Sequence, residues 1–256
     1  MPYSRLSTAK IARAAGCHPN TVRLYENWGF LPPVDRSPKG YRLYTQSHLD
    51  QMVLARTALN TGWPGRPIRR SAAALVKQAA SGDLGGALES AYHHLALVQS
   101  ERAQAETAAQ LLERWAQGAV LDATRHPLRI LDAARVLNLS VDMLRNWERN
   151  GLLTVPRNPD NGYREYGQPE MARLRVIRML RGAGYSLMAI LRMLTQLDRG
   201  ESSGLREALD TPRPDEDVYT AADHWLTTLA DQEIVARKLI ELLEARIARE
   251  AREASR

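Results

Sequence analysis

The sequence predicts a mainly α-helical protein that contains one domain twice, with a long helix behind each copy. Three observations lead to this fold class. Residues 6–46 and 128–168 align without a gap at a constant offset of 122. Short helical segments separated by turn residues recur in both copies. Behind each copy, apolar residues keep a heptad spacing over several heptads, which is typical of a coiled-coil seam.

The two copies share 12 identical residues over the 41 aligned positions. The identities gather in three motifs, which are an arginine and a glutamate three apart, a glycine-leucine turn and the pattern Gly-Tyr-Arg-x-Tyr. They occupy residues 23–26, 29–31 and 40–44 in copy one, and residues 145–148, 151–153 and 162–166 in copy two. A period of 122 is far longer than the roughly 20–50 residues of a solenoid repeat. The pattern therefore indicates a duplicated domain.

Each copy begins with two short helices. In copy one, residues 8–15 form an alanine-rich helix that Gly16 ends, because glycine adopts positive φ freely. The next helix opens at His18-Pro19, since proline suits the first helical position, and stops near Gly29. Ser140 is the matching N-cap in copy two. Two short helices joined by a turn are the helix-turn-helix pattern.

A hairpin or wing is expected next. Pro32-Pro33 excludes helix, and residues 41–44 alternate in the manner of a short strand. In copy two, residues 158–162 are a strong turn signal before the same strand. A third helix is predicted over 47–59 and 170–181, and a fourth starts near Ser186 with a less regular counterpart in copy one.

The long helices complete each half of the chain. Seam residues are spaced alternately four and three from Leu84 to Ala116, broken only by Arg102, and again from Val218 to Leu243, broken by Gln232. The predicted domains are a winged helix-turn-helix over 1–80, a coiled-coil helix over 84–118, a second winged helix-turn-helix over 124–200 and a second coiled-coil helix over 215–253.

The net charge of +6 alternates in step with the repeat. It is +8 over residues 1–70, −3 over 71–123, +6 over 124–200 and −5 over 201–256. Two basic modules separated by acidic segments favour two patches that meet a polyanion. No apolar stretch approaches the ~18 residues of a membrane span. The one cysteine, Cys17, cannot form an internal disulfide, which fits a reducing cytoplasm.

These motifs resemble the DNA-binding domain of the MerR family of transcriptional regulators. The family signature is close to Arg-Tyr-Tyr-Glu, followed by a Gly-Leu-Leu or Gly-Phe-Leu turn, a Gly-Tyr-Arg-x-Tyr wing and a Gly-Tyr-Ser-Leu helix start. Copy one matches at 23–26, 29–31 and 40–44, and copy two at 151–153, 162–166 and 184–187. The resemblance implies winged helix-turn-helix units that bind DNA and long helices that pair antiparallel. Leu24 and Asn146 depart from the signature by replacing an aromatic residue, and the cysteine pair of metal-sensing relatives is absent.

By this resemblance the second helix of each copy enters the major groove and the wing contacts phosphates. The residues expected to contact DNA are Asn20, Thr21, Arg23, Tyr25, Tyr41 and Arg42 in copy one, and Met143, Arg145, Trp147, Tyr163 and Arg164 in copy two. The alternative is that the two recognition-helix arginines are merely solvated and that Tyr25 and Trp147 belong to the core. Glu26 and Glu148 are expected to brace the fold or to orient an arginine.

Other candidate sites carry less chemistry. A group of ring-bearing residues on or beside the long helices either lines a small-molecule pocket or packs the seam: Tyr92, Trp115, Tyr219, His224 and Trp225. Cys17 and the adjacent His93-His94 lack the spacing of metal ligands. The sequence shows no nucleophile motif, paired-carboxylate motif or phosphate loop. We therefore expect no enzyme activity, no metal and no cofactor.

The offset suggests how the two copies cooperate. An antiparallel hairpin of the chain's own long helices would put copy two where the family's second subunit sits. A monomeric pseudo-dimer is thus expected, rather than a homodimer with four DNA-binding units. The resemblance implies double-stranded promoter DNA and RNA polymerase as partners, with a small-molecule effector left open. The alternative is a small-molecule (drug)-binding or sequestering protein on the same scaffold.

Overall fold

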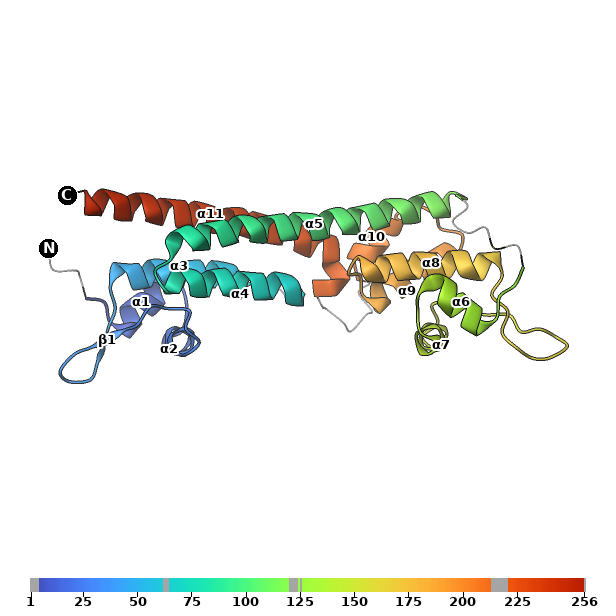
Figure 1. The fold of residues 1–256 in the computed structure, drawn as a ribbon, viewed down its shortest axis with the longest axis horizontal. Helices are drawn as coiled ribbons and strands as arrows, with labels where there is room; N and C mark the ends of the chain where they lie inside the picture. Colours follow the sequence, from blue (N-terminus) through green and yellow to red (C-terminus); the bar gives the residue numbers. More distant parts are fainter. Residues whose placement is uncertain (1–4, 62–64, 120–123, 125, 213–220, 256) are drawn as a thin grey trace. The chain divides into compact units, whose positions relative to one another are not determined.

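The computed structural model describes residues 5–61, 65–119, 124, 126–212 and 221–255. The protein is mainly helical, which confirms the predicted fold class (Figure 1). It divides into two compact units, of which unit 1 comprises Met1–Ser100 and Leu229–Arg256 and unit 2 comprises Glu101–Thr228. The long helices α5 (Leu84–Ala116) and α11 (Trp225–Ala254) therefore each contribute to both units. No helix among the described residues is long and apolar enough to cross a membrane.

Unit 1 contains the first winged helix-turn-helix. Its elements before α5 are α1 (Thr8–Ala14), α2 (Pro19–Asn27), β1 (Asp35–Arg36), β2 (Arg42–Leu43), α3 (Gln46–Leu59) and α4 (Arg66–Ala80). The two strands pair antiparallel with Asp35 opposite Leu43, and a bridge between Leu6 and Tyr44 ties the chain before α1 to the wing. These bounds agree with the predicted segments to within a residue or two. In contrast to its irregular sequence pattern, α4 is a regular helix of 15 residues.

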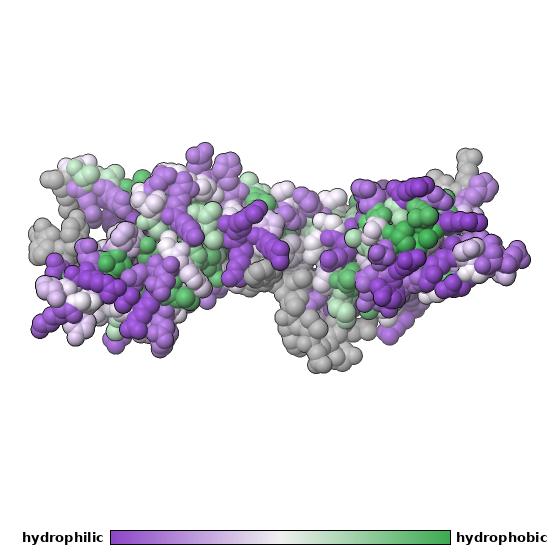
Figure 2. Space-filling model, turned by 60° about the horizontal axis from the view of Figure 1, so that its bottom comes forward, coloured by the Kyte–Doolittle hydropathy of each residue, from purple (hydrophilic) through white to green (hydrophobic). Residues whose placement is uncertain are grey.

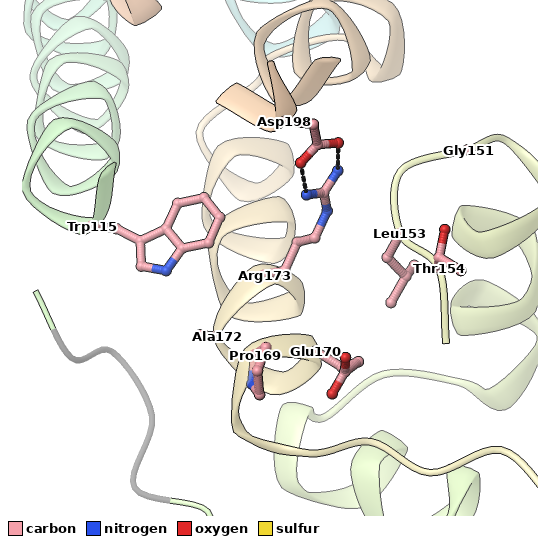
Figure 3. Close-up of a pocket in the computed structure, with 9 residues that line it drawn as sticks. All are labelled: Trp115, Gly151, Leu153, Thr154, Pro169, Glu170, Ala172, Arg173 and Asp198. Atoms are coloured by element: carbon pink, nitrogen blue, oxygen red, sulfur yellow. Dashed lines mark hydrogen bonds and ion pairs between the residues drawn. The ribbon is translucent and has the colours of Figure 1, made fainter. Parts of the chain in front are cut away.

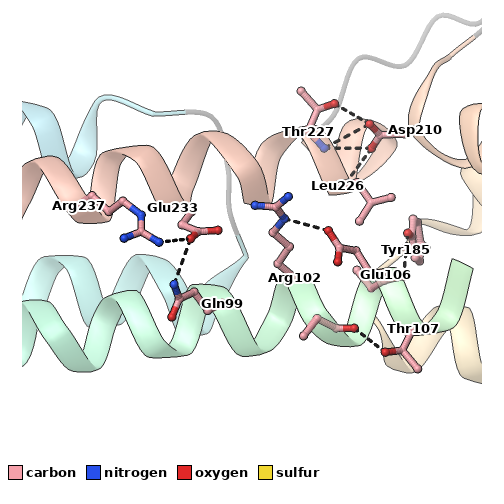
Figure 4. Close-up of polar contacts among 12 residues, drawn as sticks. Gln99, Arg102, Glu106, Thr107, Tyr185, Asp210, Leu226, Thr227, Glu233 and Arg237 are labelled. Carbon is pink, nitrogen blue, oxygen red and sulfur yellow. Dashed lines mark hydrogen bonds and ion pairs between the residues drawn. The ribbon is translucent and has the colours of Figure 1, made fainter. Parts of the chain in front are cut away.

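The end of α11 completes the core of unit 1. Buried residues of α1 to α4 and of the first turns of α5 form one cluster, and Leu239, Ile240 and Leu243 of α11 belong to it. The two long helices run antiparallel here, because Tyr92 Oη donates to Glu244 at 3.0 Å and, further along α5, Gln99 Nε2 donates to Glu233 at 3.0 Å (Figure 4). Sequence-distant segments thus form a single hydrophobic core.

Unit 2 contains the second copy. Its elements between the long helices are α6 (Ile130–Leu137), α7 (Val141–Arg149), α8 (Gln168–Gly182), α9 (Leu187–Asp198), α10 (Leu205–Asp210) and the 3₁₀ helix η1 (Ala221–His224). The bridge between Leu128 and Tyr166 matches that between Leu6 and Tyr44, and the bridge between Arg157 and Arg164 stands where copy one has its hairpin. The part of α5 that belongs to unit 2 is anchored by Tyr185, a fully buried residue whose hydroxyl donates to the carbonyl of Ala105 at 3.2 Å.

The helix α11 begins later than its predicted domain limit of 215. It starts at Trp225, after η1, whereas Val218 of the predicted seam lies outside the described residues. The carboxylate of Asp210, at the end of α10, accepts from the backbone N–H of Leu226 at 2.7 Å and from Thr227 Oγ1 at 2.6 Å (Figure 4). A carboxylate at a helix N-terminus satisfies the free N–H groups and complements the helix dipole. The cap therefore comes from a helix that the sequence pattern did not reveal.

Candidate nucleic-acid interface

The candidate recognition helices are α2 and α7, nine residues each, at equivalent positions of the two copies. Each is capped by its predicted residue. His18 Nδ1 accepts from the backbone N–H of Asn20 at 3.2 Å, and Ser140 Oγ accepts from that of Met143 at 3.1 Å. A side-chain cap fixes where the first turn begins. The residues that follow are thereby given a defined orientation on the helix surface.

The exposed faces of these helices differ in charge. Asn20 and Arg23 are exposed on α2, and Thr21 is half-buried. On α7, Met143 and Arg145 are exposed, and the guanidinium of Arg145 lies 3.6 Å from the carboxylate of Asp142. Asp142 aligns with Asn20, so only the second face holds a carboxylate beside its arginine. The two faces are therefore unequal surfaces for a polyanion.

The expected exposure of Tyr25 and Trp147 is corrected. Tyr25 is 7% exposed and Trp147 is 4% exposed, so both rings belong to the core. Each follows another buried residue at helical spacing, Val22 in α2 and Leu144 in α7, and therefore lies on the inner stripe of its helix. The ring of Tyr25 also meets Phe30 edge-on at 5.5 Å. Burial raises the pKa of its hydroxyl.

In both copies a glutamate of the recognition helix holds the arginine of the wing. Arg42 Nε donates to Glu26 Oε2 at 2.6 Å, and Arg164 Nε donates to Glu148 Oε2 at 2.7 Å. The hydrogen bond to Glu148 raises the pKa of Arg164. Charge-assisted bonds of this length are among the stronger side-chain contacts. They couple the wing to the recognition helix, in the orienting role expected for the two glutamates.

The wing tips present aromatic residues to the solvent. Tyr41 is 70% exposed and Tyr163 is 60% exposed, each directly after a glycine with positive φ. The turn is further fixed by an arginine that donates to the glycine carbonyl, Arg36 to Gly40 at 3.4 Å in copy one and Arg157 to Gly162 at 3.1 Å in copy two. Both tips therefore place a ring and basic groups on one edge.

Sequence reasoning missed two basic residues of copy two, Arg129 and Arg157. The guanidinium carbon of Arg129 lies 5.3 Å from the ring centre of Tyr163, within cation–π range. Four arginines line one hollow of about 340 Å³: Arg129, Arg145, Arg157 and Arg164. The repeat alignment offered a signal for the first of these, since Arg129 stands opposite Ser7.

Figure 2 shows a largely hydrophilic face with a compact hydrophobic group among the polar residues. Several large apolar side chains of α6 and α7 are exposed, including Leu131 at 59%, Val136 at 50% and Met143 at 42%. Scattered exposed apolar residues are ordinary on protein surfaces. The basic hollow next to them is the more specific feature.

The described candidate ligand residues belong to different units, Tyr92 to unit 1 and Trp115, His224 and Trp225 to unit 2. Tyr92 is 51% exposed in unit 1, where its hydroxyl meets Glu244. His224 Nδ1 lies 2.9 Å from the carbonyl oxygen of Asp210, and Trp225 is buried and donates from Nε1 to Ala183 at 2.8 Å. Each of these two has a ring nitrogen paired with a backbone carbonyl, which is a structural role. Tyr219 lies outside the described residues.

Trp115 of this group lines a cavity that has a volume of about 520 Å³ and lies in unit 2. The described residues offer no comparable candidate for a metal site. No group of three His, Cys, Asp or Glu side chains that could hold an ion occurs within the described part of the chain. Burial raises the pKa of the Cys17 thiol, which disfavours the thiolate that metals bind.

Comparison with known proteins gives relatives that match parts of the chain. The chain is 34% identical over 76 residues to a probable heavy metal-dependent transcriptional regulator of Haemophilus influenzae, covering 30% of this chain and 59% of that protein. It is 36% identical over 58 residues to the HTH-type transcriptional regulator CueR of Escherichia coli, covering 23% and 43%. It is 31% identical over 120 residues to the HTH-type transcriptional repressor CarH of Myxococcus xanthus, covering 46% and 40%. The chain thus spans about half the length of the curated relatives it matches, and no solved structure matches it.

The family comparison covers both copies. The model of the MerR HTH family of regulatory proteins matches residues 6–75 and again residues 128–197, which is more than half of the chain. These two ranges enclose the helix-turn-helix, wing and following helices of unit 1 and of unit 2. The chain therefore belongs to the MerR HTH family, a family of DNA-binding transcription regulators rather than enzymes, and carries two tandem MerR domains.

Proposed function

We propose that this protein is a sequence-specific DNA-binding regulator of transcription that works as a single-chain pseudo-dimer. One observation carries the proposal, which is that the last helix of the chain belongs to the core of the first DNA-binding unit. Leu239, Ile240 and Leu243 of α11 lie in the same buried cluster as Ile11 and Val22 of the first helix-turn-helix. One chain thus supplies the long helix that a second subunit would otherwise supply.

Polar contacts support the same reading. Arg246, 7% exposed, donates to Gln51 Oε1 at 2.9 Å and to Ser47 Oγ at 3.0 Å, both on α3. One turn further, Arg249 pairs with Asp50. A guanidinium that is buried needs fixed partners, because an unsatisfied buried charge is costly. These polar contacts fix the position of α11 on α3 more specifically than apolar packing alone would.

The proposed DNA contacts are the exposed residues of α2, α7 and the wings. They are Asn20, Thr21, Arg23, Tyr41 and Arg42 in copy one, and Met143, Arg145, Tyr163, Arg164, Arg129 and Arg157 in copy two. Arginines can bind guanine edges in the major groove or phosphates. Because only copy two holds Asp142 and the four-arginine hollow, the operator should be an imperfect palindrome.

The regulatory setting follows from the family and its relatives. Promoter DNA is the proposed target, RNA polymerase at that promoter the proposed partner, and the cytoplasm the proposed location. We further propose that the protein distorts the DNA between its half-sites, since deformation lets a protein act at base pairs that it does not touch. Effector control belongs to the same proposal.

Two experiments test these claims separately. Light scattering on the purified protein should give the 28.7 kDa of one chain, and a mass twice as large at all concentrations would refute the pseudo-dimer. Footprinting on the DNA upstream of its own gene should show two unequal half-sites. Failure of a folded protein to protect any DNA at low salt would refute the regulator.

Variants localise the contacts. Arg23→Ala and Arg145→Ala should each weaken operator binding by ~1–3 kcal/mol if they contact bases. Arg252→Ala removes an exposed arginine near the end of α11 and serves as the matched control. If all three variants bind alike, the assignment of α2 and α7 as recognition helices is wrong.

A further inference from the structure

Unit 2 contains a cavity of about 520 Å³ that the DNA-binding function does not use (Figure 3). It is bounded by Trp115 near the end of α5, by the N-terminal half of α8 and by the segment that follows α7. Figure 3 shows the Trp115 ring on one side of α8 and Leu153 and Thr154 on the other, with the paired Arg173 and Asp198 beside them. The volume lies within the range of small-molecule sites.

One wall of this cavity is held rigidly by Arg173. Its Nε donates to the carbonyl of Leu152 at 2.6 Å, and its two terminal nitrogens donate to the carboxylate of Asp198 at 2.6 and 2.8 Å. Arg173 of α8 is therefore bonded both to Asp198 at the end of α9 and to Leu152. Leu152 directly follows Gly151, just after the end of α7. A bidentate arginine–carboxylate pair is geometrically well defined.

Unit 1 has the same tie, made by a different residue. Gln51, which aligns with Arg173, donates to the carbonyls of Phe30 at 3.1 Å and Val76 at 2.8 Å. At the offset of 122, these partners align with Leu152 and Asp198. The two copies therefore conserve one architectural link while changing its chemistry from a neutral amide to an ion pair.

The surroundings of Gln51 in unit 1 and of Arg173 in unit 2 differ. In unit 1, Arg246 binds Ser47 and Gln51 and Arg249 binds Asp50. The residues that align with Ser47, Asp50 and Gln51 are Pro169, Ala172 and Arg173, and all three line the cavity of unit 2. Arg246 and Arg249 thus occupy in unit 1 the surface whose counterpart in unit 2 borders the cavity. A hollow of about 390 Å³ beyond Arg249 is lined by polar side chains alone.

The substitutions in copy two suit an open site. Pro169 and Ala172 replace the serine and aspartate that receive the arginines in copy one, so they offer no polar partner to an incoming side chain. The cavity lining among the described residues carries two carboxylates, Glu170 and Asp198, against one guanidinium, which leaves a net charge of −1. Trp115 adds a large aromatic surface. Aromatic rings and an uncompensated negative charge favour a cation with a flat apolar body.

We propose that this cavity of unit 2 binds one flat aromatic cation per chain, with Trp115 as the aromatic wall and Glu170 as the charge that selects the cation. The inference deepens the proposed function, because it gives the regulator's effector a site and a chemical class. A ligand there lies against Arg173, which is bonded to the residue following the Gly151 turn behind α7. Binding at this place is therefore positioned to bias the recognition helix of copy two.

The test uses three bicyclic compounds of similar size and the intact protein without DNA. Equilibrium dialysis should show saturable binding of 1-methylquinolinium at one per chain. Neutral quinoline should bind several-fold more weakly and anionic 2-naphthalenesulfonate at least about tenfold more weakly. Absence of saturation for the cation up to about 1 mM, near the weak limit for such small ligands, would overturn the proposal. Equal binding of the anion would also overturn it.

Variants assign the binding to this cavity. Trp115→Ala should weaken binding of 1-methylquinolinium by about tenfold, whereas Trp115→Phe should restore most of it. Glu170→Gln should weaken the cation but not quinoline, since glutamine still accepts the hydrogen bond from Gly167 that Glu170 Oε2 accepts at 2.9 Å. Trp28→Ala, which removes an exposed tryptophan of unit 1, is the control. Trp115→Ala binding that equals the control would refute the site.

The outcomes separate this inference from the proposed function. Dialysis needs no DNA, and footprinting needs no ligand. Cation binding without any footprint would keep the ligand site and refute the regulator, which would favour the sequestering protein. A footprint without cation binding would keep the regulator and refute the site.

Discussion

Replacing Arg246 by alanine tests whether α11 truly completes unit 1. The side chain is 8% exposed and joins α11 to Gln51 and Ser47 of α3. It also pairs with Glu250 on its own helix at 3.0 Å. Arg246 is more buried than Arg249, the other arginine of α11 that contacts α3, whose side chain is 41% exposed. The substitution therefore removes a specific seat rather than a surface charge.

The expected loss can be worked from these contacts. Gln51 is fully buried, so the missing bond to its Oε1 leaves a buried acceptor unsatisfied, at a cost of about 1–3 kcal/mol. The aliphatic stem of the arginine loses packing worth about 1 kcal/mol. The pair with Glu250, which is 48% exposed, contributes less than about 0.5 kcal/mol. The free energy of unfolding should therefore fall by about 2–4 kcal/mol.

Urea denaturation followed by circular dichroism measures this loss, with Arg252→Ala as the exposed control. Repeating it over about a hundredfold range of protein concentration adds a second readout. If α11 belongs to its own chain, the midpoint does not move with concentration. If α11 comes from a partner chain, each tenfold increase in concentration adds about 1.4 kcal/mol of stability.

Two results would refute the reasoning. A loss below about 0.5 kcal/mol, indistinguishable from that of Arg252→Ala, would mean that α11 is not seated on α3. A midpoint that rises with concentration would mean that the seat is filled by another chain. The first result concerns the packing, and the second concerns only which chain supplies the helix.

Three further predictions address other contacts. Glu148→Gln should destabilise the second wing by about 1 kcal/mol, because the ion pair with Arg164 becomes a hydrogen bond from Arg164 to an uncharged amide, and an unchanged thermal midpoint would contradict this. Gly184→Ala should cost about 2–4 kcal/mol in urea denaturation, because φ is +97° and a Cβ would lie 2.6 Å from Nε1 of Trp225; a cost like that of an exposed substitution would disprove it. Burial lowers the pKa of His94 below its usual 6.5, so the unfolded chain binds the proton more readily and stability should fall as pH drops below 6.5. His94→Leu should lessen that fall, and equal acid sensitivity of both proteins would show that another group is responsible.

The sequence was most informative where structure is local. The N-caps His18 and Ser140 and the turn glycines act within a few residues, so the helix-turn-helix units were predicted closely from the chain itself. The heptad spacing also agrees with the burial of Leu229, Gln232 and Ala236 on α11. Local chemistry and periodicity are readable without knowing the partner.

The sequence was least informative where the partner is distant. The start of α11 is set by Asp210, which belongs to a short helix with no periodic signal. The expected exposure of Tyr25 and Trp147 was wrong, because the side of α2 or α7 that faces the core depends on the rest of the unit. Trp115 was named as a possible pocket residue, but the other walls of its cavity were not predicted, since they come from α8 and the segment after α7, which are distant in sequence.

Duplication explains why such an asymmetry can persist. In a symmetric dimer of identical chains, a substitution that opens a cavity opens it in both subunits, and one that seals it seals both. Here the tie on α3 and the tie on α8 are encoded separately, so Gln51 with Arg246 can serve stability while Arg173 with Asp198 borders an open cavity. The same independence lets α7 carry Asp142 where α2 carries Asn20. Fusing two units in one chain thus allows one copy to carry the proposed ligand site and the two copies to meet the proposed unequal half-sites, which identical subunits cannot do.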